Sequence, residues 1–410
     1  MAQPQYNMQQ QIYCWNFMSN AGFGLMAPNY QALVTDITGL INKIRTDTAV
    51  TALIGTDWDP IWGPCVYSKN PTAANVVSDN TMMMVYSPSQ ATIVIAIAGT
   101  NPDSVFDWSS EDFAVSTMVS WSSVVGTNNV PANAYISTGT DTGLQILLGM
   151  PANTGATGSP DLITALSNFL ALESTPSGLT LAVTGHSLGG ALSPTMAAYL
   201  NDILQNGNNW NSTNKVTGKI QAWPTAGPTP GEQNFASHLE TSLAYTSQYN
   251  IVDAVPHAWG KIDLALIPFL YGFNLPNSPD VDALVLYLEN QANQAPYPYV
   301  QANRTSLPGT FSATVDAAAQ TEFETWVNKF PALQTYETLF RYLCQVGYQH
   351  TSAYPPDTML NVAAYSAASK ADRDAMFPSQ TLEQVIIQAI VNIIIKYITN
   401  KTASGTSTPA

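Results

Sequence analysis

Apolar residues recur along the chain with two periodicities, one typical of helices and one typical of buried strands. Residues 30–45 carry apolar side chains at helical spacing with a polar outer face, which predicts an amphipathic helix. Two apolar runs at 82–86 and 92–98 are separated by a Ser-Pro-Ser-Gln turn and predict a hairpin in a buried sheet. Further strand-like runs lie at 179–184, 219–223, 243–249 and 343–348, with helical patterns at 161–172, 191–204 and 315–330. This alternation predicts an α/β fold with a mostly parallel central sheet flanked by helices.

Two segments do not fit the alternation. Residues 57–64 (DWDPIWGP) combine Trp with Pro60 and Pro64, and because proline interrupts regular structure we expect a packed connector there. Residues 382–398 are almost wholly apolar apart from a polar residue at every fourth position, which predicts a helix with one narrow polar stripe. We interpret it as a helix buried against the core, with an oligomer contact or a lipid-facing element as alternatives. The polar interruptions argue against a transmembrane segment.

Composition narrows the classes of function. The 410 residues include 13 Lys and Arg against 28 Asp and Glu, a net charge of −15, and only 10% of the residues are charged. Nucleic acid is excluded as a partner, because phosphate recognition needs clustered basic side chains. The three cysteines form neither a disulfide framework nor a CxxC motif. Residues 1–22 carry no recognisable signal peptide, so the composition is compatible with a secreted or a cytoplasmic protein.

The strongest chemical motif is Gly-His-Ser-Leu-Gly-Gly at 185–190, between a predicted strand and a predicted helix. A serine held on so sharp a turn needs neighbours without side chains two positions before and two positions after it, and Gly185 and Gly189 meet this need. The motif therefore predicts Ser187 as a nucleophile on a strand–turn–helix elbow that also contains His186. The alternative is that Ser187 only caps the following helix.

A serine nucleophile needs a base and an acid, which in this architecture follow it in the order acid, then histidine. Of the four histidines, His257 and His350 come late enough in the chain. Asp253 follows a strand-like run and precedes a proline turn, which suits a rigidly held acid. Because His257 lies only four residues beyond Asp253, we favour His350 as the base and expect His257 near the rim of the site.

The developing oxyanion needs two hydrogen-bond donors. One is the backbone amide of Leu188, the residue after the nucleophile. The second is expected from a loop after an early strand, where Gly99 and Thr100 follow the run at 92–98. Thr100 could supply both its amide and its hydroxyl to the oxyanion.

Taken together, five segments resemble the class 3 lipase family in order and spacing. They are 97–100 (IAGT), 107–113, 185–190, 225–236 and 253–256 (DAVP), and the resemblance covers roughly residues 80–355. It implies an α/β-hydrolase fold and carboxylester hydrolysis without a cofactor. It also matches Ser187, Asp253 and His350 to the catalytic triad, matches Thr100 to the oxyanion donor, and implies a lid at about 103–112.

Departures from the family pattern suggest how the domain is organised. Ala98 stands where the family commonly has Arg. In addition, 97 residues separate Asp253 from His350, and we therefore expect an insertion at about 258–308 that caps the site. Residues 1–79 are expected as an N-terminal extension packing on the core, and 80–400 as the hydrolase domain. A C-terminal helix is expected at about 380–399 and a flexible tail at 401–410.

The leading hypothesis is a lipase acting on triacylglycerols through an acyl-enzyme, at a lipid–water interface. A phospholipase, a feruloyl-type or polyester esterase, and an acyltransferase use the same machinery and remain alternatives. Neither HExxH nor a histidine cluster occurs, so no metal site is predicted. The sequence leaves the acyl-chain preference and the oligomeric state open.

Overall fold

The computed structural model describes residues 3–104, 111–112, 114–126, 130–150, 160–276, 278–356 and 358–403. Its central sheet has the strand order β12-β11-β9-β8-β5-β4-β2, with the short β10 beside β9. The strands are β2 (Asp59–Tyr67), β4 (Asn80–Ser87), β5 (Thr92–Ile97), β8 (Thr180–His186), β9 (Gln221–Thr225), β10 (Ala244–Tyr245), β11 (Ser247–Asn250) and β12 (Arg304–Leu307). Neighbours from β5 to β12 are parallel, and only β4 is antiparallel to β5 and β2. The mostly parallel sheet predicted from the sequence is confirmed.

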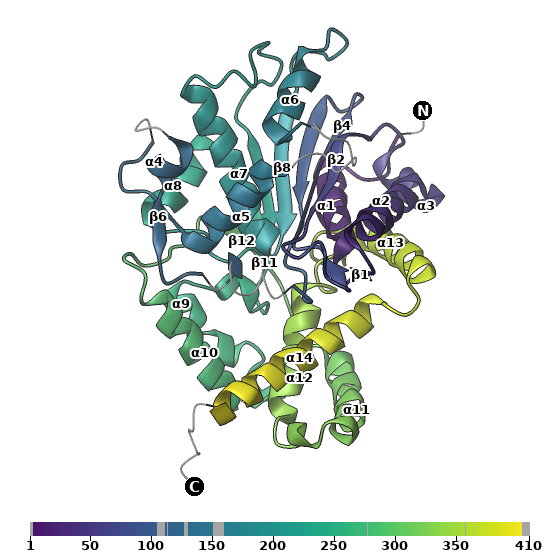
Figure 1. Ribbon diagram of the computed structural model, residues 1–410, viewed down its shortest axis with the longest axis vertical. Helices are drawn as coiled ribbons and strands as arrows, with labels where there is room; N and C mark the ends of the chain where they lie inside the picture. The colour runs from purple at the N-terminus through teal and green to yellow at the C-terminus, as the bar shows by residue number, and fades with distance from the viewer. Residues whose placement is uncertain are drawn as a thin grey trace.

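Helices cover both faces of the sheet (Figure 1). One face packs on α5 (Thr138–Gly149), α6 (Leu162–Ala171), α7 (Leu188–Gln205) and α8 (Gln233–Ser242). The other packs on α1 (Met8–Ser19), α2 (Tyr30–Thr46), α3 (Thr48–Ile54) and α13 (Ala363–Met376). Because side chains alternate along a strand, Met82 and Met84 enter the first core and Met83 and Val85 enter the second.

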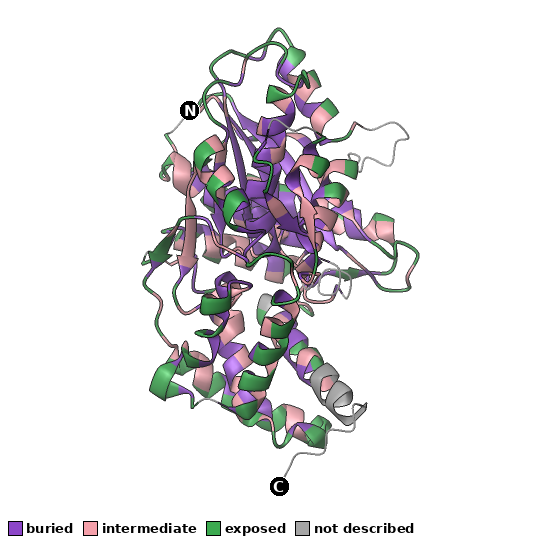
Figure 2. Ribbon diagram, turned by 90° about the vertical axis from the view of Figure 1, so that its left-hand side faces the viewer, coloured by how far each residue is buried: buried purple, intermediate pink, exposed green. Residues whose placement is uncertain are grey.

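A third group of helices lies beyond the carboxyl ends of the parallel strands and has its own apolar cluster (Figures 1 and 2). It comprises α9 (Lys261–Leu264), α10 (Pro279–Ala292), α11 (Ala313–Lys329), α12 (Glu337–His350) and α14 (Leu382–Ala403). In α14, Val391 and Ile394 are fully buried in this cluster, whereas Gln388 and Asn392 on the polar stripe are exposed. The helix therefore buries its apolar face within the molecule.

Short elements complete the described chain. They are η1 (Asn20–Gly22), β1 (Met26–Ala27), β3 (Val76–Val77), β6 (Met118–Ser120), α4 (Trp121–Val125), β7 (Tyr135–Ser137), η3 (Val255–His257), η4 (Ile267–Phe269), η5 (Gly272–Asn274) and η6 (Pro331–Leu333). Among the described residues, no helix combines the length and apolarity that crossing a membrane requires.

Two predicted elements are wrong. Residues 343–348, expected as a strand, lie in α12, because the whole segment 337–350 has helical spacing and buries residues such as Phe340, Cys344 and Gln349. Residues 57–64, expected as an irregular connector, contribute to strand β2. This strand is at the edge of the sheet and is irregular on either side of Trp62, which lets it hold two prolines.

Other predicted helices and strands are confirmed. The helix at 30–45 is confirmed as α2, and the hairpin is confirmed as β4 and β5. Residues 1–79 supply α1, α2 and α3 on one face of the sheet and also the strand β2. Residues 258–308 hold α9 and α10 and, at their end, the sheet strand β12. Residues 105–110 of the expected lid and 404–410 of the expected tail lie outside the described residues, and α14 extends to Ala403.

Candidate active site

The segment at 185–190 forms a sharp turn between β8 and α7. Ser187 has φ 61° and ψ −126°, a conformation rarely adopted by a residue with a side chain and one that costs about 1–3 kcal/mol. A Cβ at Gly185 would lie 2.3 Å from the Gly189 carbonyl oxygen, and one at Gly189 would lie 2.4 Å from the Ile97 oxygen. The turn therefore requires glycine at both positions, as the sequence pattern predicts.

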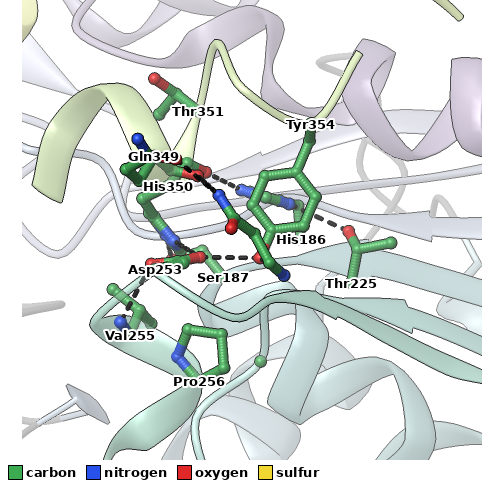
Figure 3. Close-up of polar contacts among 12 residues, drawn as sticks. His186, Ser187, Thr225, Asp253, Val255, Pro256, Gln349, His350, Thr351 and Tyr354 are labelled. Carbon is green, nitrogen blue, oxygen red and sulfur yellow. Dashed lines mark hydrogen bonds and ion pairs between the residues drawn. The ribbon is translucent and has the colours of Figure 1, made fainter. Parts of the chain in front are cut away.

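Three side chains form a continuous hydrogen-bonded row at the carboxyl ends of the sheet strands (Figure 3). The Oγ of Ser187 lies 2.7 Å from Nε2 of His350, whose Nδ1 lies 2.8 Å from Oδ2 of Asp253. Ser187 follows β8, Asp253 follows β11, and His350 is the last residue of α12. With a neutral imidazole, Nδ1 donates to the carboxylate and Nε2 accepts the serine proton, which is the arrangement that activates a serine nucleophile.

Asp253 is fully buried, and each of its carboxylate oxygens accepts a hydrogen bond. Oδ1 accepts from the amide of Val255 at 3.0 Å, whereas Oδ2 accepts from both His350 and the hydroxyl of Tyr354, the latter at 2.7 Å. The Tyr354 oxygen in turn accepts the amide of Asn250 at 3.0 Å. A buried carboxylate with three donors is fixed in orientation, so it can hold one ring tautomer of His350.

The C-terminal end of α12 is tied to the sheet next to His350. The side-chain amide of Asn250, the last residue of β11, donates to the backbone oxygen of Gln349 at 3.2 Å and to its Oε1 at 2.8 Å. The Gln349 amide donates to the Thr310 oxygen at 2.7 Å. These bonds fix the position of a histidine that comes from a helix end and not from a strand end.

His186 is hydrogen-bonded to the backbone of His350. Its Nε2 lies 2.6 Å from the backbone oxygen of His350, and its Nδ1 lies 2.9 Å from Oγ1 of Thr225. Burial lowers the pKa of His186 to about 3, so the ring is neutral, with Nε2 donating to the carbonyl and Nδ1 accepting from Thr225. Asn16 of α1 donates to Oγ1 of Thr225 at 3.2 Å and to Oγ1 of Thr184 at 3.0 Å.

The candidate oxyanion donors lie on either side of the nucleophile. Within the described chain, neither the amide of Thr100 nor that of Leu188 donates a hydrogen bond to another residue. The Thr100 hydroxyl donates to Oδ2 of Asp112 at 2.8 Å, so in this structure its amide, and not its hydroxyl, is the available donor. Burial raises the pKa of Asp112 to about 7.

The remaining histidines lie apart from this row. His257 is buried in η3, where its Nε2 lies 3.3 Å from the Ile251 oxygen. His238 pairs with Asp202 at 2.7 Å, and this carboxylate also accepts from the Trp121 indole. No cluster of three or more His, Cys, Asp or Glu side chains that could hold a metal ion occurs in the described part of the chain.

Three supporting residues were not singled out from the sequence: Asn16, Asn20 and Tyr354. Asn20 accepts the amide of Gly99 at 2.8 Å, and the others are described above. None of them lies in a short motif with recognisable spacing. Tyr354, four residues after His350, offered the only local signal, since a polar aromatic residue so close to a predicted base is well placed to reach the acid.

Comparisons with known proteins agree with this architecture. Residues 94–262 match the family model described as lipase (class 3). The crystal structure of M37 lipase is similar with a TM-score of 0.66 and 25% identity, over 91% of this chain and 98% of that one. Lipases of Rhizopus microsporus var. chinensis (TM-score 0.40, 15% identity, 62% and 70% covered) and Penicillium expansum (0.37, 17%, 66% and 78%) share only limited structural similarity. No curated protein matches the chain significantly.

Proposed function

This chain belongs to the class 3 lipase family and is a carboxylic ester hydrolase with an α/β-hydrolase fold; from this premise we propose that it hydrolyses acylglycerols through a Ser187–His350–Asp253 triad. The observation that carries the proposal is the unbroken row of hydrogen bonds from Ser187 through His350 to Asp253. Such a row makes a hydroxyl nucleophilic at neutral pH, because the base accepts the hydroxyl proton and the acid orients the base.

The reaction has two halves. Ser187 attacks the acyl carbonyl while His350 takes its proton, and the imidazolium then gives that proton to the leaving alcohol. Water then attacks the acyl carbon while His350 takes its proton, and His350 returns that proton to the Ser187 oxygen as the carboxylic acid leaves. The Asp253 carboxylate stabilises the imidazolium, and its hydrogen bonds to Tyr354 and Val255 keep it oriented.

The amides of Leu188 and Thr100 bind the oxyanion of each tetrahedral intermediate. Their freedom from other hydrogen bonds among the described residues supports this role. Each such donor contributes about 2.7–4 kcal/mol in the transition state. Asp112 accepts the Thr100 hydroxyl and so orients the residue without using its amide.

We further propose that the substrate is met at a lipid–water interface and that residues 258–292 lie beside it as a cap. The segment between Asp263 and Asp280 has no charged residue. Its inner apolar side chains fill the third cluster, and its outer ones are exposed: Leu266, Phe269 and Phe273, with Ile262 just before them. The Tyr342 hydroxyl donates to the Ile267 oxygen, which joins the segment to the helix that ends in His350. The large exposed apolar side chains of this segment fit contact with the acyl chains of a lipid surface.

A panel of acyl esters of increasing chain length, supplied both as monomers and as emulsions, tests the proposal. The expected result is a rate that rises above the solubility limit and depends on Ser187. Phe269→Ser combined with Phe273→Ser is expected to lower the rate on emulsions and to leave the rate on a short monomeric ester unchanged. Leu172→Ser is the matched control, because Leu172 is exposed beside α6, far from α9 and α10 (Figure 1). Equal rates on emulsions for the double variant and the control would contradict the interfacial part of the proposal.

A further inference from the structure

The loop that carries Thr100 is hydrogen-bonded to the N-terminal helical region. The amide of Gly99 donates to Oδ1 of Asn20, the first residue of η1, at 2.8 Å. The side-chain amide of Asn20 donates to the backbone oxygen of Asn16 at 3.0 Å, which fixes which end of the side chain faces Gly99. The position of the oxygen that accepts the Gly99 amide is therefore fixed by the end of α1, a helix far from this loop in the sequence.

The residues on either side of Gly99 and Thr100 are hydrogen-bonded to neighbouring segments. The amide of Ala98 donates to the Thr81 oxygen at 2.9 Å. Beyond Thr100, Oδ1 of Asn101 accepts the Gly24 amide at 3.1 Å, and its Nδ2 donates to the Ser78 oxygen at 2.9 Å. Among the described contacts of this loop, Thr100 keeps its amide free while the residues on both sides of it are fixed.

Gly99 is also close to the nucleophile. A Cβ at Gly99 would lie 2.8 Å from Cβ of Ser187 and 2.6 Å from the His186 oxygen. The peptide that Asn20 holds is thus in direct contact with the elbow on its other side. A shift of this peptide would move the next amide, that of Thr100, relative to Ser187.

We infer that Asn20 is a positioning residue for the oxyanion donor: by accepting the Gly99 amide, it fixes the Ala98–Gly99 peptide, which adjoins the peptide that carries the Thr100 amide, and so places that amide for the tetrahedral intermediate. This inference rests on the proposed function and extends it to a residue outside the family match at 94–262. Donors to an oxyanion act only within a narrow range of positions, so their supports affect the transition state more than the bound substrate.

The test compares Asn20→Leu with Gln11→Leu on a soluble p-nitrophenyl ester. Leucine fills the space of Asn20 without an acceptor. Alanine is less decisive, because a cavity of about 10 Å³ beside Asn20, Gly99 and Asn101 could admit a water that replaces the lost oxygen. Gln11 is a matched control in α1, the helix that ends just before Asn20: it donates to the Tyr6 oxygen at 2.7 Å and accepts the Trp58 indole at 2.9 Å, away from the loop.

Asn20→Leu is expected to lower kcat by about ten-fold or more with KM nearly unchanged, because the loss falls on the transition state. Its affinity for a trifluoromethyl ketone, which forms a tetrahedral oxyanion on the serine, should fall by a similar factor. Gln11→Leu should lower the melting temperature and leave kcat and ketone affinity as they are. Where Asn20→Leu does not fold, Asn20→Ala should move the same two quantities in the same direction by less.

Three outcomes would overturn the inference: full kcat in both Asn20 variants, a kcat loss equal to that of Gln11→Leu, or a rise in KM at constant kcat. Ser187→Ala separates this failure from that of the proposed function. If Ser187→Ala hydrolyses the ester as fast as the unchanged protein, the proposed function is wrong and the inference falls with it. If Ser187 is essential and Asn20→Leu keeps full kcat, only the inference is wrong.

Discussion

Asp253 is the residue on which the hydrogen bonds of the site converge. It lies at the end of a strand, is inaccessible to water, and accepts bonds from a backbone amide, an imidazole and a phenol. Removing any one donor from a buried carboxylate costs more than the bond itself, because the remaining groups must reorient. The donors around Asp253 therefore offer direct tests of the site at single residues.

Tyr354→Phe is expected to lower kcat by about ten-fold, because a hydrogen bond to a charged group is lost and Asp253 is held less firmly. The same change leaves the Asn250 amide without its acceptor and should reduce the free energy of unfolding by about 1–3 kcal/mol. Ester kinetics and urea unfolding measure the two effects. A kcat equal to that of the unchanged protein would show that Tyr354 contributes only to stability.

The choice of base is tested by two alanine variants. His350→Ala is expected to lower kcat by at least about a thousand-fold, as the loss of a triad member does. His257→Ala should leave kcat within about three-fold, because its ring contacts the Ile251 oxygen and no member of the row. Steady-state kinetics on one soluble ester measures both variants. Comparable losses in the two would show that the base has been assigned wrongly.

The sequence predicts the motif-bearing residues of the site better than their supports. Ser187 lies in a local pattern whose glycines have a steric purpose, so its turn could be read directly. Tyr354, Asn16 and Asn20 contribute through contacts between segments distant in the chain, which no local spacing records. The contact of His186 with the His350 oxygen depends in the same way on how α12 packs.

At the scale of the elements, the turn between β8 and α7 tolerates little change. Gly185→Ala is expected to destabilise the protein by about 1–3 kcal/mol and to abolish ester hydrolysis, because its methyl group would press on Gly189 and displace Ser187. Gly149→Ala, at the end of α5, is the matched control, since no atom of the described residues lies within 4 Å of a Cβ there.

Gly149→Ala should leave hydrolysis unchanged and stability equal or slightly higher, because alanine restricts the unfolded chain more than glycine does. Thermal unfolding measures the stability of both variants, and ester kinetics measures their hydrolysis. If Gly185→Ala keeps full activity, the elbow does not need the geometry described.

The two wrongly predicted elements have different physical causes. The run at 343–348 is short and apolar, and such runs do not distinguish a strand from a buried helix until the neighbouring residues at 337–342 extend the helical spacing. The prolines at 57–64 exclude a central strand but not an edge strand with irregular pairing, which is what β2 is. Edge position is a property of the whole sheet and cannot be deduced from the segment alone.

At the scale of the whole molecule, buried carboxyl groups link stability to pH. Burial raises the pKa of Glu111 to about 8 and that of Asp112 to about 7, and the charges of Asp112 and Asp79 add to the effect on Glu111. The folded state thus keeps protons that the unfolded chain releases. Between pH 4.5 and 8, bounded by the ordinary and the raised pKa of Glu111, the free energy of unfolding should fall as pH rises.

Glu111→Gln should make this fall shallower, by up to about 1.4 kcal/mol per pH unit, because one proton no longer takes part. The amide can still accept the Asn80 hydrogen bond that the carboxylate accepts at 3.1 Å. Urea unfolding across this pH range measures the slope. Glu324→Gln on the exposed surface of α11 is the control and should leave the slope as it is. An unchanged slope in Glu111→Gln would contradict the raised pKa.

The central claim is that Ser187 is the nucleophile of an ester hydrolase, and covalent labelling tests it most directly. The protein is treated with a fluorophosphonate until hydrolysis of a soluble ester stops, and the adduct is located by peptide mass spectrometry. One adduct per chain is expected, on Ser187, and it should form in step with the loss of hydrolysis. Complete loss of hydrolysis with the adduct on another residue, or with Ser187 unmodified, would contradict the central claim.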